Sequence, residues 1–168
     1  MVGTRRPPNR RGVTREEPVL PVVYIDADAC PVKAEVFKVA GRYDLRVVVV
    51  ANQFQQVPQA PTVELVVVPG FGAVDDYIAE TIGPGDLAVT ADVPLAARCV
   101  ARGAEVVDPK GRVLSADTIG EAVAVRDLMA ELREAGAATG GPGPMTPADR
   151  SRFRAALDGA VNRAKRRR

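Results

Sequence analysis

Short apolar runs of strand character alternate with helical segments along this chain, and that alternation constrains the fold more than any other feature. Five runs are rich in Val, Ile and Leu: residues 19–26, 46–51, 63–68, 86–90 and 105–107. Helices are expected between them, over about 31–41, 73–82 and 94–102. Continuous β-branched runs predict strands buried on both faces. The pattern therefore predicts an α/β fold, a three-layer α/β/α sandwich whose central sheet is mainly parallel.

Charge and composition divide the chain into three parts. Residues 1–18 hold three prolines, five arginines and two glutamates, with little apolar content, so we expect a disordered basic arm. Residues 19–145 form the expected α/β domain and carry a net charge of −7. Residues 146–168 carry +6 and are expected to form a C-terminal helix and a basic tail. A helix over about 119–135 is expected to present an apolar stripe made of Ile119, Val123, Leu128 and Leu132.

Several residue types are absent or sparse, and this excludes some chemistries. The chain has no histidine, which removes Ser-His-Asp and Cys-His catalysis as well as imidazole metal ligation. Its apolar runs are far shorter than the ~18 to 20 residues that span a bilayer, so no contact with a membrane is expected. The two cysteines lack the spacing of a disulfide framework or a metal knuckle. These features favour a cytoplasmic protein.

Aspartates follow the predicted strands at three places. Asp26 and Asp28 end the first strand, Asp75 and Asp76 open a helix, and Asp92 follows the fourth strand. The carboxyl ends of parallel strands meet at one edge of a sheet, so these carboxylates are expected to converge there. Converging carboxylates repel one another unless a cation neutralises them, which indicates Mg²⁺ or Mn²⁺. Each aspartate taken singly also suits a helix N-cap, and one of Asp75 and Asp76 is expected to face inward while the other caps.

Other polar residues near these strand ends are candidates for substrate contact. Thr90 is expected to orient Asp92 or a phosphate, and Asn52 ends the second strand. Lys33 and Arg126 are candidate phosphate partners. Cys30 precedes a proline at a helix start, and the neighbouring carboxylates oppose formation of a thiolate, so a packing or capping role is expected for it.

Two familiar motifs fit less well. Gly70-Phe-Gly72 follows a strand and opens a helix, but Asp75 stands where a dinucleotide fingerprint has its third glycine and would repel a pyrophosphate. Tyr24-Ile-Asp26-Ala-Asp28 is similar to the first motif of haloacid-dehalogenase-type phosphatases. In those enzymes a Ser/Thr motif precedes the late acidic pair, whereas here Asp75 and Asp76 precede Thr90. The phosphatase interpretation is therefore kept only as a less favoured alternative.

The combined motifs resemble the YaiI/YqxD family of uncharacterised bacterial proteins. They are Asp26-Ala-Asp-Ala-Cys-Pro31, Val74-Asp-Asp-Tyr-Ile78, Thr90-Ala-Asp-Val-Pro-Leu-Ala96, Gly103-Ala104 with Asp108-Pro-Lys-Gly111, and Gly140-Gly-Pro142 followed by Asp149-Arg150 and Phe153. That family is similar to PIN/NYN nuclease-like domains, which implies a PIN-like sandwich. The resemblance implies roles in a metal site for Asp26, for Asp75 or Asp76, and for Asp92. In PIN domains a further acidic residue follows the Thr-x-Asp motif, whereas Pro94 and Leu95 follow it here.

These observations lead to one main hypothesis and one principal alternative, besides the less favoured phosphatase. The main hypothesis is a metal-dependent phosphodiesterase that acts on RNA, with Asp26, Asp28 and Asp92 as catalytic residues. Its Mg²⁺ or Mn²⁺ ligands would come from Asp26, Asp75, Asp76 and Asp92. The alternative is a non-catalytic module of the same fold that binds nucleic acid or protein.

Overall fold

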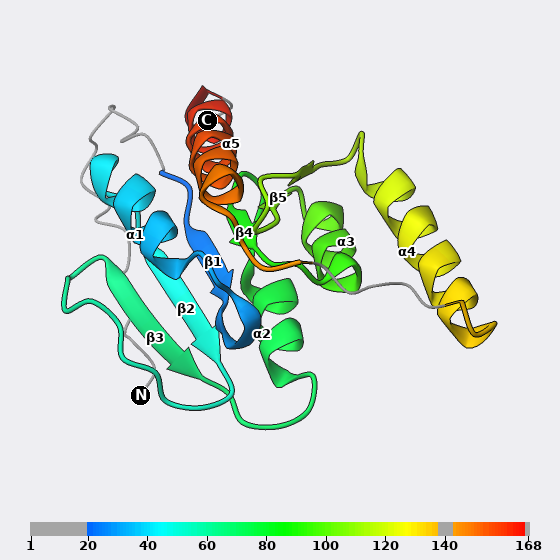
Figure 1. Cartoon of the computed structure of the whole chain (residues 1–168). Helices are drawn as coiled ribbons and strands as arrows, with labels where there is room; N and C mark the ends of the chain where they lie inside the picture. The colour runs from blue at the N-terminus through cyan, green and yellow to red at the C-terminus, as the bar shows by residue number, and fades with distance from the viewer. Residues whose placement is uncertain (1–19, 138–142, 167–168) are drawn as a thin grey trace.

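The computed structural model describes residues 20–137 and 143–166 of the chain (Figure 1). Within these ranges the strands are β1 (Val23–Asp26), β2 (Val47–Ala51), β3 (Val63–Val67), β4 (Leu87–Val89), β5 (Glu105–Val107) and β6 (Val113–Leu114). The helices are the 3₁₀ turn η1 (Ala27–Ala29), α1 (Lys33–Arg42), α2 (Ala73–Thr81), α3 (Val93–Ala101), α4 (Ile119–Glu134) and α5 (Pro147–Arg166). The predicted arm at residues 1–18 lies outside the described residues.

The strands form one sheet in the order β3-β2-β1-β4-β5-β6, and only the last pairing, β5 with β6, is antiparallel among the described strands. Val23 of β1 lies between Val47 of β2 and Leu87 of β4. The chain thus adds β2 and β3 on one side of β1 and then returns to add β4 on the other. The β1/β4 boundary is a topological switch point, where open α/β sheets collect ligands beyond the carboxyl ends of their strands.

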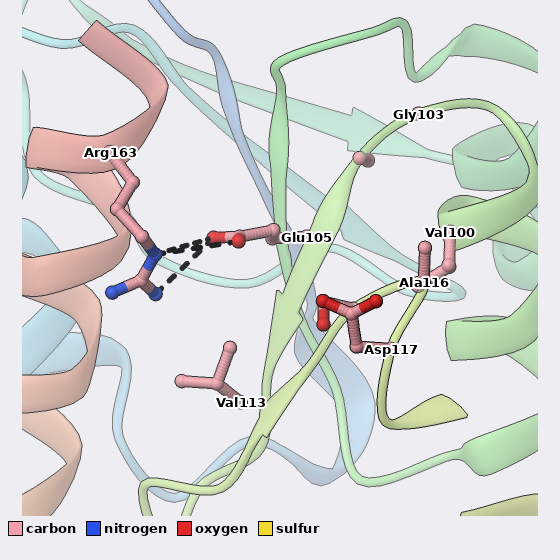
Figure 2. Close-up of a pocket in the computed structure, with 9 residues that line it drawn as sticks. Val100, Gly103, Glu105, Val113, Ala116, Asp117 and Arg163 are labelled. Carbon is pink, nitrogen blue, oxygen red and sulfur yellow. Dashed lines mark hydrogen bonds and ion pairs between the residues drawn. The ribbon is translucent and has the colours of Figure 1, made fainter. Parts of the chain in front are cut away.

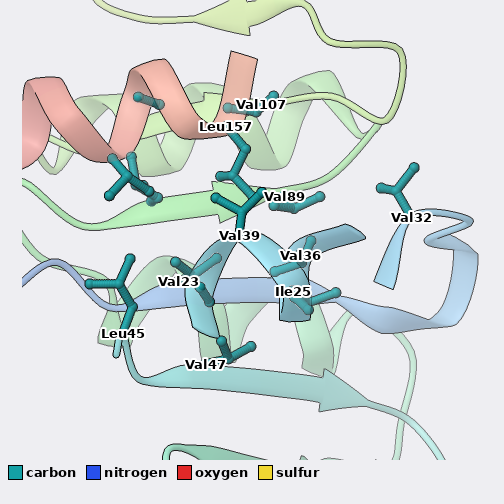
Figure 3. Close-up of a cluster of buried hydrophobic side chains, with 14 of the residues drawn as sticks. Val23, Ile25, Val32, Val36, Val39, Leu45, Val47, Val89, Val107 and Leu157 are labelled. Atoms are coloured by element: carbon teal, nitrogen blue, oxygen red, sulfur yellow. The ribbon is translucent and has the colours of Figure 1, made fainter. Parts of the chain in front are cut away.

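Helices cover both faces of the sheet (Figure 1). Alternate residues of each strand point to opposite faces, so Val23 and Ile25 enter one buried cluster while Tyr24 enters the other. The first cluster joins the sheet to α1 and α5, and Figure 3 shows some of its side chains, among them Ile25 of β1, Val39 of α1 and Leu157 of α5. The second cluster joins the opposite face to α2 and α3. This arrangement confirms the predicted α/β sandwich with a mainly parallel sheet.

Two long helices differ in how they are used. α5 packs against α1 and contributes buried side chains to the first cluster, with Phe153 and Leu157 fully buried. α4 contacts the rest of the protein mainly through α3 and projects from it (Figure 1). Leu128 and Leu132, predicted to lie on a packed stripe, are 51% and 38% exposed. The distal part of the predicted stripe therefore faces solvent, because α4, with 16 residues, packs mainly on α3, which has only 9.

The expected element types are confirmed, and the bounds differ by a few residues. The largest difference is at the first strand, predicted from residue 19 and found from Val23. The first helix, predicted from about residue 31, is found from Lys33. The backbone first makes the 3₁₀ turn η1, and Val32 then serves as the N-cap without a side-chain hydrogen bond. No described helix combines the length and apolar character needed to cross a membrane.

Candidate acidic site at the carboxyl edge of the sheet

Thr90 connects the ends of the two central strands. Asp26 is the last residue of β1 and is half-buried, and its Oδ2 accepts a hydrogen bond from the Thr90 hydroxyl at 2.9 Å. The same hydroxyl oxygen accepts one from the backbone N–H of Asp92 at 3.0 Å. Because Thr90 is buried, both bonds are shielded from water, and they hold Asp26 beside the start of α3.

Asp92 is the N-cap of α3. Its Oδ1 accepts a hydrogen bond from the backbone N–H of Leu95 at 2.9 Å, and Pro94 stands in the first turn, where a missing N–H costs nothing. Capping of the helix thus uses only one of the two carboxylate oxygens of Asp92. Neither Asp92 Oδ2 nor Asp26 Oδ1 accepts a hydrogen bond from any residue that the structure describes.

Asp75 and Asp76, adjacent in the first turn of α2, have different surroundings. Asp76 forms an exposed ion pair with Arg98, at 2.9 Å between Oδ1 and Nη1. Asp75 is half-buried, and its pKa is raised by desolvation and then by repulsion from Asp92 and Asp26. Asp75 is therefore the more buried of the two, but the prediction that the other aspartate caps the helix is wrong. The N-cap of α2 is Gly72, without a side-chain cap hydrogen bond, and the Asp76 carboxylate pairs with Arg98 instead.

The pKa of Asp26 is raised as well. Desolvation by burial is the largest cause, and repulsion from Asp92 and Asp28 adds to it, while the hydrogen bond from Thr90 opposes it. Asp26, Asp75 and Asp92 are therefore near enough at this edge of the sheet to affect one another's charge. Among the described residues they do not form a group of three ligands that could hold an ion.

Asp28 lies in η1 and points toward β2. Its carboxylate accepts hydrogen bonds from the backbone N–H of Asn52 at 3.1 Å and from the Gln55 amide at 3.4 Å. The ammonium of Lys33 donates to Oε1 of Gln55 at 2.7 Å. The Asn52 side-chain nitrogen can in turn donate to the carbonyls of Val68 and Gly70, at 3.0 and 3.2 Å. Asp28, Asn52 and Lys33 thus brace the loops beside the site.

The remaining candidates lie in different places. Arg126 is on α4, exposed, with its guanidinium 3.4 Å from the neighbouring Asp127 carboxylate, and it is absent from the lining of the acidic cavity. Cys30 does line that cavity, and burial raises the pKa of its thiol. Both cysteines are free, as their spacing predicted.

A cavity of about 150 Å³ opens between the ends of β1 and β4. Its lining consists of Asp26, Ala29, Cys30, Thr90, Ala91, Asp92 and Pro109. Two carboxylates with unshared oxygens offer the hard donors that Mg²⁺ and Mn²⁺ take. Across residues 20–137 and 143–166, no three Asp, Glu or Cys side chains stand close enough to hold an ion by themselves. The donor set still fits Mg²⁺, which usually keeps several waters and takes one or two carboxylates.

A larger cavity, of about 540 Å³, lies at the opposite, amino-terminal end of β5 (Figure 2). The carboxylate of Glu105 there accepts from the Arg163 guanidinium, at 3.3 Å between Oε2 and Nη2. Asp117 also lines it, immediately before α4. This end of the sheet holds none of the predicted acidic residues, and the Glu105 carboxylate is already neutralised by Arg163. We therefore place the candidate site at the smaller, acidic cavity.

A second cavity adjoins the acidic one, and it was not predicted from the sequence. It has a volume of about 280 Å³, and Ala29, Ala91 and Pro109 line both cavities. Lys110 stands at its edge. The available signal was the turn sequence Asp108-Pro-Lys-Gly111 directly after β5, which places a lysine at the same carboxyl edge.

Known proteins of similar sequence are found in many bacteria. The family model described as the uncharacterised YaiI/YqxD family matches residues 24–163. A UPF0178 protein of Rhodopseudomonas palustris (strain BisB18) is 55% identical over 145 residues, 86% of this chain and 94% of that protein. One from Paramagnetospirillum magneticum is also 55% identical, covering 86% of this chain and 96% of that protein. One from Brucella ovis is 53% identical over 152 residues, or 89% and 94%. No solved structure matches. The chain therefore belongs to the YaiI/YqxD family.

Proposed function

We propose that this protein is a metal-dependent phosphodiesterase acting on RNA, with its centre at Asp26 and Asp92. The observation that carries the proposal is the cavity at the switch point, lined by both carboxylates, each with an oxygen that no described residue uses. A cation bound between two carboxylates that repel each other in a partly desolvated site would relieve that repulsion.

In this proposal some residues bind the metal ion and others position those ligands or the neighbouring loop. Asp26 and Asp92 would hold Mg²⁺ or Mn²⁺, and Thr90 fixes Asp26 and the backbone of Asp92 in relation to each other. Asp75 adds negative charge beside them. Asp28 keeps the neighbouring loop in place through Asn52 and Gln55. When bound, the ion polarises a phosphoryl oxygen and lowers the pKa of a water.

Cleavage of labelled single-stranded RNA in the presence of Mn²⁺ tests the proposal. Asp26→Asn and Asp92→Asn are expected to reduce the rate by more than the roughly 10–100-fold typical of losing an outer partner of a metal ligand. Asn retains N-capping ability at position 92, so that variant separates ion binding from helix capping.

Asp76→Asn is the matched control, because it removes one charge from the same edge while its carboxylate pairs with Arg98 in solvent. It is expected to cleave at close to the parent rate. If the parent does not cleave RNA with either ion, or if cleavage survives both substitutions, the proposal is wrong. Salt-sensitive RNA binding without turnover would instead favour the non-catalytic alternative.

A further inference from the structure

The second cavity at the carboxyl edge, which adjoins the acidic one, has a lining suited to a partly apolar group. Its lining is mainly small and apolar, consisting of Ala29, Pro31, Ala91, Pro109, Gly143 and Met145 with Asp108 and Lys110. The volume of about 280 Å³ is near the lower end of small-molecule pockets, roughly 300 to 1,000 Å³. Proline faces and a thioether pack against an aromatic ring, and methionine adapts its shape to what it contacts.

The lining of this cavity includes a cation that is available to a ligand. The Lys110 ammonium makes no hydrogen bond or ion pair with any residue in the described part of the chain, and the side chain is exposed. Asp108 is engaged, since its Oδ1 accepts from the backbone N–H groups of Lys110 and Arg112, at 3.0 and 2.9 Å. Lys110 is therefore the group of this cavity that can bind an anion, while Asp108 Oδ1 holds the turn that carries it.

The turn that carries Lys110 is fixed before any ligand arrives. The Asp108 carboxylate closes it from within. Gly111, with φ of +91°, lies so close to α5 that a Cβ there would be 2.8 Å from the carbonyl carbon of Arg152. Pro109 is buried and forms part of the boundary with the acidic cavity. A preorganised cation loses little freedom on binding, which favours a specific site.

We infer that this cavity binds one nucleoside monophosphate unit of the substrate, with the base against Pro31, Pro109 and Met145 and a phosphate at Lys110. The inference rests on the proposed function, because the shared wall of Ala29, Ala91 and Pro109 connects the cavity directly to the acidic centre. It extends that function, since it assigns the recognition of a nucleoside to residues that take no part in holding an ion.

Methyl NMR of the full chain, with ¹³C-labelled methionine and EDTA present, tests the inference without any turnover. Met145 lines the cavity, while Met129 lies on α4 and serves as an internal control. UMP and AMP are expected to shift the Met145 signal in a saturable manner and to leave Met129 unmoved. Inorganic phosphate is expected to produce no comparable shift.

Two substitutions, one of a lysine and one of an arginine, separate the phosphate contact from general charge. Lys110→Gln is expected to weaken binding of UMP roughly 10-fold or more, and to leave binding of uridine unchanged. Arg112→Gln removes a charge two residues away, outside the cavity lining, and is expected to bind UMP like the parent.

The inference is wrong if UMP leaves Met145 unmoved at millimolar concentration, if phosphate alone gives the same shift, or if both variants bind UMP equally well. Its failure is distinguishable from that of the proposed function. RNA cleavage with no Met145 shift would refute the nucleoside site alone. A Met145 shift in a protein that cleaves nothing would leave the site standing and refute the hydrolase.

Discussion

Gly111 is the residue whose replacement most directly tests how the Lys110 turn is held. Its backbone φ of +91° is unfavourable for any residue with a side chain. A Cβ at this position would meet the carbonyl carbon and oxygen of Arg152 at 2.8 and 2.9 Å, and the nitrogen of Phe153 at 3.0 Å. These atoms belong to the backbone of α5, so they cannot rotate away. Either the turn or the helix must move in Gly111→Ala.

The expected loss of stability has two parts. The left-handed backbone costs roughly 1–2 kcal/mol with a Cβ, and overpacking against fixed atoms costs roughly 1–3 kcal/mol more. A total of about 3 kcal/mol corresponds to a fall in Tm of roughly 6–12 °C for a domain of this size. Gly136→Ala isolates the first part, because Gly136 has φ of +81° and a Cβ there would have no described atom within 4 Å beyond its chain neighbours. That control is expected to lose only about 1–2 kcal/mol.

Urea unfolding followed by circular dichroism measures both variants under the same conditions. If Gly111→Ala loses no more stability than Gly136→Ala, contact with α5 does not fix the turn. The inference that Lys110 is preorganised for binding is then wrong. A second readout is binding: the displaced turn is expected to weaken the Met145 response to UMP, which Gly136→Ala leaves unchanged.

Three further predictions concern the acidic edge and the cysteines. Burial and neighbouring carboxylates raise the pKa of Asp26 above its ordinary 3.8, so between the two values the folded state binds more protons and stability falls as pH rises. Asp26→Asn is therefore expected to be more stable than the parent at pH 7, with the difference closing toward pH 4 in thermal melts; a constant difference would contradict this. Thr90→Val leaves the N–H of residue 92 without its hydroxyl partner and is expected to lose about 1–3 kcal/mol in urea unfolding, whereas Thr90→Ser stays near the parent. Burial raises the pKa of Cys99 to about 11, so at pH 8 its thiol is expected to react with Ellman's reagent only after denaturation, and prompt labelling of both cysteines would refute this.

The layer architecture could be predicted because several strands are almost continuous runs of apolar, β-branched residues. β2 is Val47-Val-Val-Val-Ala51, buried at every position, and such a run has few alternatives to a central parallel strand. The exposed half of α4 could not be predicted in this way. An amphipathic stripe states which face is apolar, but it does not state how far a neighbouring layer extends beneath it.

The relation between Asp26 and Asp28 shows a different limit of sequence patterns. Two residues apart in a strand, their side chains would share a face of the sheet. The strand ends at Asp26, however, and the 3₁₀ turn Ala27–Ala29 changes the direction of the chain. Asp26 then meets Thr90 after β4, while Asp28 meets Asn52 after β2. Although the two aspartates are only two residues apart, Asp26 therefore lines the cavity while Asp28 holds the loop after β2.

Strand order explains why the acidic residues gather where they do. Asp26 and Thr90 are 64 positions apart, and they meet only because the chain returns to β1 after building β2 and β3 on its other side. From that boundary the chain leaves β1 for α1 on one face and leaves β4 for α3 on the other, which opens the crevice between them. Had β4 been added beyond β3, Asp26 and Asp92 would be separated by two strands, at about 4.8 Å per strand spacing. The meeting of Asp26, Thr90 and Asp92 is therefore a property of the topology, and on another strand order Asp92 could still cap its helix without lying beside Asp26.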